Sequence, residues 1–343
     1  MPNRRDFIKS TSLAAGATAL TTGTANGTQP AVNAKQKLFR DRLLECLGGA
    51  WPKGGDLKPE KTKTEQKDGY RLEWLTYELE PGDRCPAILL IPDGVSDKSP
   101  APAVAIWHQH AGQWHLGKTE PAGLAGNPMH HTGAVLAKLG YVVLCPDALC
   151  FEERQDPRKN LRGGAYERFE FLRYTVAGQC MAWKNSLDMR RAIDYLVSRP
   201  EVKAARLGCY GHSMGSTHTW LVGPWEPRLR ALVGNCCLPT YGGIHRTSLL
   251  HCFPNFIPGI HKYGDTPDIA GLIAPRALHL NLGETDGGSP IQEAREGVKT
   301  IAKAYAQAGV PENFSSFIEP KTGHVLSDKM WDHVQQFFAK HLS

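Results

Sequence analysis

Apolar and polar residues follow one another along the chain in blocks that predict buried strands separated by helices. Short continuous apolar runs bounded by Gly, Pro or charged residues predict strands covered on both faces. They occupy residues 86–92, 103–108, 141–146, 205–210, 231–235 and 277–282. Residues 70–79 alternate apolar and polar side chains and predict one more strand.

Longer segments between these runs have the spacing of amphipathic helices. They cover residues 36–47, 179–198, 291–308 and 327–341. In the second segment, apolar and small residues recur at intervals of four and three, as one face of a helix requires. Strands that alternate with helices and are joined by right-handed crossovers predict an α/β fold, with a doubly wound, mostly parallel sheet and helices on both faces.

Three long stretches interrupt this alternation. They are residues 109–130, 148–177 and 236–267, and each follows a predicted strand at its carboxyl end. Ligands bind at that edge of open α/β sheets. The third stretch is rich in Pro, Gly, His and aromatic residues. We therefore expect these stretches to form long loops over an active site.

The amino terminus has the pattern of a targeting signal. Asn3 to Lys9 contains two arginines, a spacer, Phe, an apolar residue and Lys, and the small, moderately apolar residues 10–25 follow. This order resembles the bacterial twin-arginine signal, and the stretch is too short and too rich in Thr, Gly and Ala for a membrane-spanning helix. We expect residues 1–30 to direct export to the periplasm or the medium, with cleavage between residues 19 and 31. We expect residues 31–343 to form a single domain.

Composition and charge exclude several classes of protein. The 343 residues are 41% hydrophobic and 22% charged, which is typical of a soluble globular chain. The formal net charge of +6 is mild and no dense Lys/Arg run occurs, so nucleic-acid binding is not expected. None of the nine cysteines forms a C-x-x-C pair, which disfavours a zinc ribbon or a thioredoxin-like site and favours buried thiols.

A catalytic serine is indicated by Gly211-His212-Ser213-Met214-Gly215. This G-x-S-x-G motif follows an apolar run and precedes a short helical pattern, which is the strand–turn–helix context of a nucleophile elbow. The flanking glycines allow strand and helix to approach closely. The start of the helix offers backbone N–H groups, that of Met214 first, to a developing oxyanion. We therefore predict Ser213 as a nucleophile.

A serine hydroxyl needs a base, and that base needs a carboxylate to orient it. His324 lies in a turn before the last helix, and Asp286 follows the strand at 277–282. Glu284 is the alternative carboxylate. The order Ser, Asp, His is the one found in hydrolases with this elbow. We predict a triad of Ser213, Asp286 and His324.

The loop after the strand at 103–108 is expected to complete the site. It supplies the second oxyanion donor, for which we predict the backbone N–H of His110, with the side chain of His110 or Gln109 as alternatives. The same loop is expected to bind substrate through Gln109, Trp114, Lys118 and Glu120.

Two other functions are suggested by motifs in the same region and are disfavoured. Residues 112–119 read G-x-x-x-x-G-K-T, the pattern of a phosphate-binding loop, but residues 120–128 contain two prolines and two glycines and cannot start the helix that the motif requires. A metal site is suggested by His108, His110, His115, His130 and His131. No carboxylate or cysteine joins them at ligand spacing. We predict no nucleotide, no metal and no cofactor.

The chain resembles the dienelactone-hydrolase and acetyl-xylan-esterase-like branch of the α/β-hydrolases. The resemblance rests on residues 211–215, on 274–276 leading into 283–286, on 323–324 and on 108–112, and it extends over residues 85–340. It implies the α/β-hydrolase fold and hydrolysis of carboxylic esters through an acyl-enzyme, without metal or organic cofactor. Dienelactone hydrolases have cysteine where this chain has Ser213, and acetyl xylan esterases usually have a polar residue where Met214 stands.

The expected substrate is a small-molecule or carbohydrate ester, such as an acetylated carbohydrate. The alternatives are a peptidase of the same fold and an inactive hydrolase-fold protein that only binds its ligand. Retention of all three predicted triad residues favours an enzyme.

Overall fold

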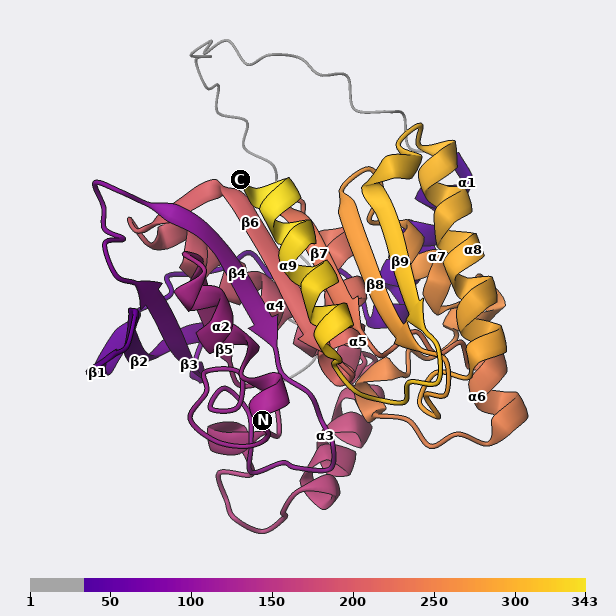
Figure 1. The fold of residues 1–343 in the computed structure, drawn as a ribbon. Helices are drawn as coiled ribbons and strands as arrows, with labels where there is room; N and C mark the ends of the chain where they lie inside the picture. The colour runs from indigo at the N-terminus through magenta and orange to yellow at the C-terminus, as the bar shows by residue number, and fades with distance from the viewer. Residues whose placement is uncertain (1–33) are drawn as a thin grey trace, which may run out of the picture. The chain divides into compact units, whose positions relative to one another are not determined.

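A computed structural model describes residues 34–343, so the predicted export signal at residues 1–30 lies outside the described residues. A nine-stranded sheet with strand order β1-β2-β3-β5-β4-β6-β7-β8-β9 runs through them (Figure 1). Strands β5, β4, β6, β7, β8 and β9 are mutually parallel, and β1, β2 and β3 form an antiparallel edge that joins β5. The predicted α/β-hydrolase fold is confirmed.

The strands occupy the segments that the apolar runs predict, with shifts of a few residues at their ends. Their bounds are β1 Glu60–Lys67, β2 Tyr70–Glu80, β3 Asp83–Pro92, β4 Ala101–Trp107, β5 Val142–Pro146, β6 Val202–His212, β7 Leu229–Asn235, β8 Ala277–Gly283 and β9 Phe314–Glu319. Strands β1 and β9 were not predicted.

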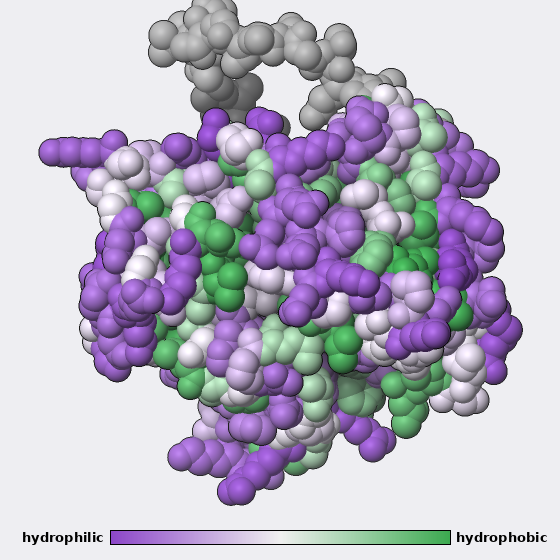
Figure 2. Space-filling view, in the orientation of Figure 1, coloured by the Kyte–Doolittle hydropathy of each residue, from purple (hydrophilic) through white to green (hydrophobic). Residues whose placement is uncertain are grey.

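Helices cover both faces of the sheet. Helices α2 (Thr132–Lys138) and α9 (Asp328–Leu342) pack with one set of buried strand residues. Helices α1, α4, α5, α7 and α8 pack with the other set; their bounds are Ala34–Leu47, Met181–Ser198, Met214–Val222, Thr266–Gly271 and Ile291–Gln307. Two helices, α3 (Gly164–Val176) and α6 (Tyr241–Thr247), belong to the long segments that follow β5 and β7. The face that α2 and α9 cover is mostly hydrophilic at its surface, with hydrophobic residues in separate patches (Figure 2).

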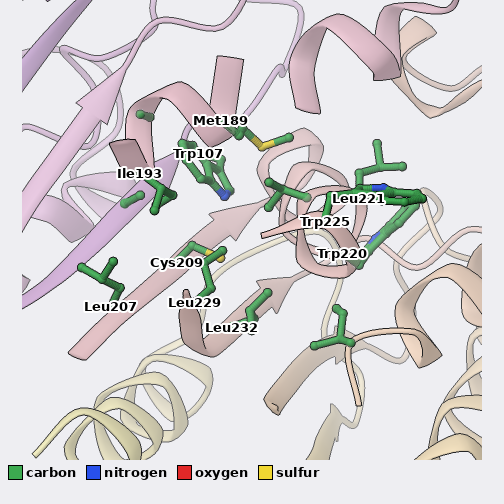
Figure 3. Packing of buried hydrophobic residues seen from close by; sticks show 14 of the residues in the cluster. Trp107, Met189, Ile193, Leu207, Cys209, Trp220, Leu221, Trp225, Leu229 and Leu232 are labelled. Atoms are coloured by element: carbon green, nitrogen blue, oxygen red, sulfur yellow. The ribbon is translucent and has the colours of Figure 1, made fainter. Parts of the chain in front are cut away.

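Strand β4 shows why its sequence is apolar throughout. Ala103, Ala105 and Trp107 belong to one buried cluster, and Val104 and Ile106 belong to the cluster on the opposite face. Successive strand side chains point to opposite faces, so a strand covered on both sides needs apolar residues at every position. Figure 3 shows Trp107 beside Met189 and Ile193 of α4 and near Cys209 of β6, all in the first of these clusters.

The carboxyl ends of the parallel strands lie together at the edge where the long loops gather, the lower edge in Figure 1. Adjacent strands end nearly level there, with Trp107 opposite Gly211, His212 opposite Asn235 and Gly283 opposite Glu319. The segments that carry Ser213, Asp286 and His324 all leave the sheet at this edge.

Two further findings concern the described residues as a whole. No helix among residues 34–343 is both long and apolar enough to cross a membrane. All nine cysteines lie in this part of the chain as free thiols, and seven of them are buried, as their apolar surroundings in the sequence indicate.

Candidate active site

Ser213 occupies a strained turn between β6 and α5. Its φ of 56° and ψ of −116° lie in a region that residues with a side chain rarely adopt, and such strain persists only where the surroundings enforce it. The surroundings are close-packed backbone: a Cβ on Gly211 would lie 2.0 Å from the carbonyl oxygen of Gly215, and one on Gly215 would lie 1.9 Å from the carbonyl oxygen of Trp107. Both glycines of the motif are therefore sterically required.

The same close approach places backbone donors around Ser213. Met214 is the first residue of α5, so its N–H has no acceptor within the helix. The N–H of Ser213 donates to the carbonyl of Asn235 at 2.8 Å, and this hydrogen bond holds the turn against β7. Contact between Gly215 and the end of β4 brings the loop after Trp107 beside the start of α5. This is the arrangement that an oxyanion hole needs.

The side chain of Met214 packs away from solvent. It is fully buried in a small apolar cluster with Phe151, Tyr166 and Met181. Because Tyr166 belongs to α3 and Met181 to α4, this cluster joins the elbow to two helices. An apolar residue therefore suits position 214 in this structure.

Asp286 and His324 form a hydrogen-bonded pair. The Nδ1–H of His324 donates to Oδ2 of Asp286 at 2.8 Å, and the N–H of Gly288 donates to the other carboxylate oxygen at 2.7 Å. The carboxylate is 1% exposed, whereas the imidazole is 39% exposed and faces outward. This arrangement fixes the tautomer that leaves Nε2 as a proton acceptor.

Glu284, the alternative carboxylate, is engaged elsewhere. It accepts hydrogen bonds from the guanidinium of Arg295 and from the backbone N–H of Lys321, both at 3.1 Å. Asp286 is therefore the carboxylate that contacts the imidazole.

Backbone packing and one asparagine hold the histidine loop in place. A Cβ on Gly283 would lie 2.2 Å from the carbonyl oxygen of Gly323, so the loop lies directly on the end of β8. The side-chain amide of Asn235 donates to Nδ1 of His212 at 2.7 Å and to the carbonyl of Val325 at 3.3 Å. Asn235 thus ties the serine elbow to the histidine loop.

Ser213 and His324 line one hollow of about 430 Å³ at the carboxyl edge of the sheet. The hydrogen bonds of the described residues include none between the Ser213 hydroxyl and the His324 imidazole. Such contacts are often long in enzymes without substrate and tighten when substrate binds. Both groups line the hollow without being hydrogen-bonded to each other.

One wall of the hollow is a hydrogen-bonded set formed by His110, Trp114 and Glu167. The carboxylate oxygen Oε2 of Glu167 accepts from Nε2 of His110 at 2.8 Å and from the indole N–H of Trp114 at 2.9 Å. The other imidazole nitrogen of His110 accepts from the N–H of Gly112 at 3.0 Å. Because Glu167 belongs to α3, it fixes that helix to the predicted oxyanion loop.

A second part of the lining comes from the segment after β7. His251 donates from Nε2 to the carbonyl of Gly288 at 3.2 Å, and its Nδ1 accepts from the N–H of Cys252 and from the amide of Asn255. Apolar side chains flank it: Leu249, Leu250 and Phe253 also line the hollow.

Three of the predicted substrate-binding residues do not reach this hollow. Lys118 is 2% exposed and pairs with Asp147, Glu152 and Glu153 at 2.8, 2.8 and 2.6 Å. Burial lowers the pKa of Lys118, but the charge and hydrogen bonds of these carboxylates outweigh it and raise the pKa above its ordinary value. Glu120 is 2% exposed and accepts a hydrogen bond from Gln109 at 3.0 Å.

The prediction for Gln109, Lys118 and Glu120 is therefore corrected. They carry polar groups that fold the loop rather than groups presented to a ligand, because each finds its partner inside the protein. Of the predicted substrate residues, Trp114 does line the hollow.

The structure also accounts for the phosphate-binding-loop pattern and for the histidine group. No helix begins at Lys118, since the next helical turn starts at Pro128, and the lysine that would hold phosphate is taken up by carboxylates. His108 uses both ring nitrogens, one with the carbonyl of Gln109 and one with the N–H of Ala148. Within residues 34–343, the groupings with metal-ligand spacing are Cys236–Asp286–His324 and Asp147–Glu152–Glu153. The first includes the Asp286–His324 pair, and each carboxylate of the second is paired with the ammonium of Lys118.

Sequence reasoning missed Glu167, Asn235, His251 and Leu250. All lie at the carboxyl end of a strand or in the long segments expected to form the pocket walls. The segments could be recognised because they interrupt the alternation of strands and helices. The individual residues carry no motif that would single them out.

Comparison with known proteins places the fold in a family. The model of the group described as "Abhydrolase family" matches residues 51–335. The "Putative hydrolase YtaP" of Bacillus subtilis (strain 168) is 27% identical over an alignment of 309 residues, and the match covers 88% of this chain and 98% of that protein.

Solved structures are similar in fold at lower identity. One is described as "a putative acetyl xylan esterase" from Bacteroides fragilis NCTC 9343, with a TM-score of 0.66 and 21% identity, covering 83% of this chain and 74% of that chain. Another is the glucuronoyl esterase from Solibacter usitatus, with a TM-score of 0.64 and 16% identity, covering 89% and 91% of the two chains.

Proposed function

This chain belongs to the Abhydrolase family, and from that premise we propose that it is a serine hydrolase that cleaves carboxylic esters through an acyl-enzyme. Ser213 is the nucleophile, His324 the general base and acid, and Asp286 the residue that orients the imidazole. The observation that carries the proposal is the Asp286–His324 hydrogen bond at the edge of the hollow that the strained Ser213 also lines.

Acylation begins when Nε2 of His324 accepts the hydroxyl proton of Ser213 while Oγ attacks the ester carbonyl carbon. The carbonyl oxygen becomes an oxyanion. When the tetrahedral intermediate collapses, the bond to the alcohol oxygen breaks and Nε2 returns the proton to the departing alcohol. Asp286 stays ionised throughout and stabilises the imidazolium that forms in between.

Deacylation repeats these steps with water. Nε2 of His324 accepts a proton from the water molecule, whose oxygen attacks the acyl carbon. Collapse of the second tetrahedral intermediate breaks the bond to Ser213 Oγ, which regains its proton from Nε2. The products are a carboxylic acid and an alcohol, and no redox partner or cofactor enters the balance.

The oxyanion is proposed to receive hydrogen bonds from the backbone N–H groups of Met214 and His110. Support comes from the first-turn position of Met214 and from the contact between Gly215 and the end of β4. The side chain of His110 is a poorer candidate because both of its ring nitrogens are already hydrogen-bonded. Removing one such donor typically slows turnover by about 10²- to 10³-fold.

The printed names of the structural relatives support a small or carbohydrate ester as substrate, such as an acetylated carbohydrate. The test is turnover of p-nitrophenyl acetate by the wild type, Ser213→Ala and Ser316→Ala. Ser316 lies exposed on β9 and serves as the matched control. We expect Ser213→Ala to lose at least about 10³-fold in kcat with the fold intact, and Ser316→Ala to match the wild type.

Full turnover by a folded Ser213→Ala variant would overturn the assignment. A wild type that binds esters but turns none over would instead favour the hydrolase-fold binding protein. A wild type that cleaves peptide amides faster than esters would favour the peptidase.

We also propose that residues 1–30 form a twin-arginine signal and that residues 31–343 are the exported enzyme. The test is fractionation of bacteria that express the full chain or the double variant Arg4→Lys/Arg5→Lys. Esterase activity outside the cytoplasm should be lost in the double variant. Equal export of both forms, or cytoplasmic retention of both, would contradict the proposal.

A further inference from the structure

We propose that the hollow recognises an apolar, uncharged group next to the ester bond, aromatic or branched aliphatic, rather than a sugar ring. This inference rests on the proposed function and, of the two substrate classes named there, favours the small ester over the carbohydrate ester. It follows from which hydrogen-bonding groups of the hollow remain unused and from which side chains form its walls.

Most polar atoms of the side chains on the Glu167 wall are already hydrogen-bonded to one another or to backbone. Glu167 accepts from both His110 and Trp114 through Oε2, and the second nitrogen of His110 accepts from the N–H of Gly112. The remaining oxygen of Glu167, Oε1, is closed off from solvent and has no hydrogen-bond partner among the described residues. A ligand in the hollow finds no open donor or acceptor on these three side chains.

The polar side chains that the segment after β7 contributes are equally occupied. Both nitrogens of His251 are hydrogen-bonded within the protein. Burial raises the pKa of the Cys252 thiol to about 12, so at neutral pH it is an uncharged and weak donor. The strong polar side-chain groups left for a substrate are the hydroxyl of Ser213 and Nε2 of His324, and catalysis uses both.

Apolar surface makes up most of the lining, and part of it is rigid. The indole of Trp114 lies directly against the backbone of α3, since a Cβ on Gly163 or Gly164 would lie 2.9 or 3.0 Å from its ring atoms. Phe253 packs against Phe171 of α3 with ring centroids 5.0 Å apart. A wall fixed in this way binds an apolar group without paying for its own ordering.

Leu250 lies in the lining of the hollow with its side chain almost entirely in water. It is 97% exposed, the highest value among the exposed large hydrophobic residues of the described chain. A ligand with an apolar group would cover this side chain, and the removal of both surfaces from water would favour binding.

The charge of the walls also selects against anionic ligands. The lining contains the carboxylate of Glu167 and no lysine or arginine. Burial lowers the pKa of His251 to about 4, so this histidine is uncharged at neutral pH. A substrate with a carboxylate beside its ester would meet no cation in the hollow.

A sugar ring fits these walls poorly. Each hydroxyl that leaves water without a new partner costs roughly a factor of ten in binding. A phenyl or branched alkyl group makes no such demand and gains from contact with Trp114, Leu250 and Phe253.

The test compares two ester series with the full-length enzyme. In the alcohol series the acyl group is acetyl, and the alcohols are ethanol, benzyl alcohol, 4-carboxybenzyl alcohol and methyl xyloside. In the acyl series the alcohol is ethanol, and the acyl groups are acetyl, isobutyryl, phenylacetyl and glucuronoyl. The two series distinguish whether the apolar group belongs to the alcohol or to the acyl part.

We expect kcat/KM for the best apolar ester of one series to exceed that for the sugar ester of the same series by at least about tenfold. In the alcohol series this preference cannot come from the leaving group, because a sugar hydroxyl is more acidic than benzyl alcohol. 4-Carboxybenzyl acetate is expected to react several-fold more slowly than benzyl acetate.

Leu250→Ser probes the wall itself, with Leu250→Met as the matched control. Because the side chain is exposed, neither change should affect folding. Leu250→Ser should lower kcat/KM for the preferred apolar ester by about three- to tenfold more than it lowers kcat/KM for ethyl acetate, mainly through KM. Leu250→Met should retain the preference.

A preference for the sugar ester in both series, or equal loss for ethyl acetate in Leu250→Ser, would overturn the inference while leaving the ester-hydrolase proposal standing. Failure of the proposed function would look different, because no ester of either series would be turned over.

Discussion

A methyl group added at Gly215 tests whether the elbow is as tightly built as the structure indicates. In Gly215→Ala the new Cβ would lie 1.9 Å from the carbonyl oxygen of Trp107, and contacts below 3.0 Å essentially never occur. Strand β4 and helix α5 would have to separate by roughly 1 Å, although Trp107 and Met214 are 3% and 0% exposed in the packed interior. Overpacking of this kind lowers the free energy of unfolding by about 1–3 kcal/mol, occasionally more, so we expect a decrease of about 3 kcal/mol for Gly215→Ala.

The assay is urea unfolding followed by far-ultraviolet circular dichroism, together with ester turnover. With a denaturant slope of about 3 kcal/mol per molar, the midpoint should fall by about 1 M. Any folded variant should lose about 10²-fold in kcat, because Ser213 and the Met214 N–H would move by about 1 Å.

Gly55→Ala is the matched control. A Cβ at Gly55 meets nothing within 4 Å, so this change should leave the midpoint and kcat unaltered. A Gly215→Ala variant that unfolds at the wild-type midpoint and keeps wild-type turnover would refute the steric reasoning.

Three further predictions follow from individual contacts. Asp286→Asn should lower kcat by about 10⁴-fold because it favours the wrong tautomer of His324, whereas Glu284→Gln should keep more than half of the wild-type kcat. Comparable losses of kcat for the two variants in steady-state assays would contradict the choice of Asp286. Glu167→Gln can keep the hydrogen bonds to His110 and Trp114 through its amide oxygen, but Glu167→Ala leaves both donors unpaired. Its free energy of unfolding in urea should be about 2–4 kcal/mol lower. Equal urea midpoints for the two variants would contradict a stabilising role of the His110–Trp114–Glu167 hydrogen bonds. Stability should fall as the pH drops from about 6.5 towards 4, because burial lowers the pKa of several histidines when folded, so that the unfolded chain binds protons first; a urea midpoint that stays constant over this range would contradict it. Those histidines, with a pKa of about 4, 3, 4 and 4, are His108, His218, His251 and His279.

Much of the fold could be predicted because burial on both faces leaves a direct trace in the sequence. Every residue of a doubly covered strand such as β4 must be apolar, so its run stands out. Strand β1 was missed because it lies at the sheet edge and its residues Glu60 to Lys67 are mostly exposed and charged. Strand β9 was missed because none of its six residues is fully buried.

The proposed catalytic residues were recognisable because backbone geometry constrains their neighbours. The elbow admits only glycine at positions 211 and 215, which produces a readable motif around Ser213. The carboxylate and histidine follow strand ends in a fixed order along the chain. Glu284 could not be set aside from sequence alone, because only the folded chain shows it bonded to Arg295.

The substrate-facing residues were less accessible to sequence reasoning. Lys118 and Glu120 are charged residues in a loop near the site, and such residues are usually exposed. Here a buried ion-pair set draws the lysine inward, and its partners Asp147 and Glu152 come from a segment about thirty residues further along the chain. Pairings between distant segments leave no periodic signal, so the walls of the hollow emerge only from the three-dimensional structure.

The most direct test of the account is the identity of the residue that a fluorophosphonate modifies. The full-length enzyme would be treated with the reagent, digested, and mapped by mass spectrometry beside Ser213→Ala and His324→Ala. We predict one phosphonylated peptide, modified at Ser213, with no label in Ser213→Ala and much slower labelling in His324→Ala. An enzyme that hydrolyses esters yet is labelled at another residue, or at the same rate without His324, would contradict the catalytic assignment.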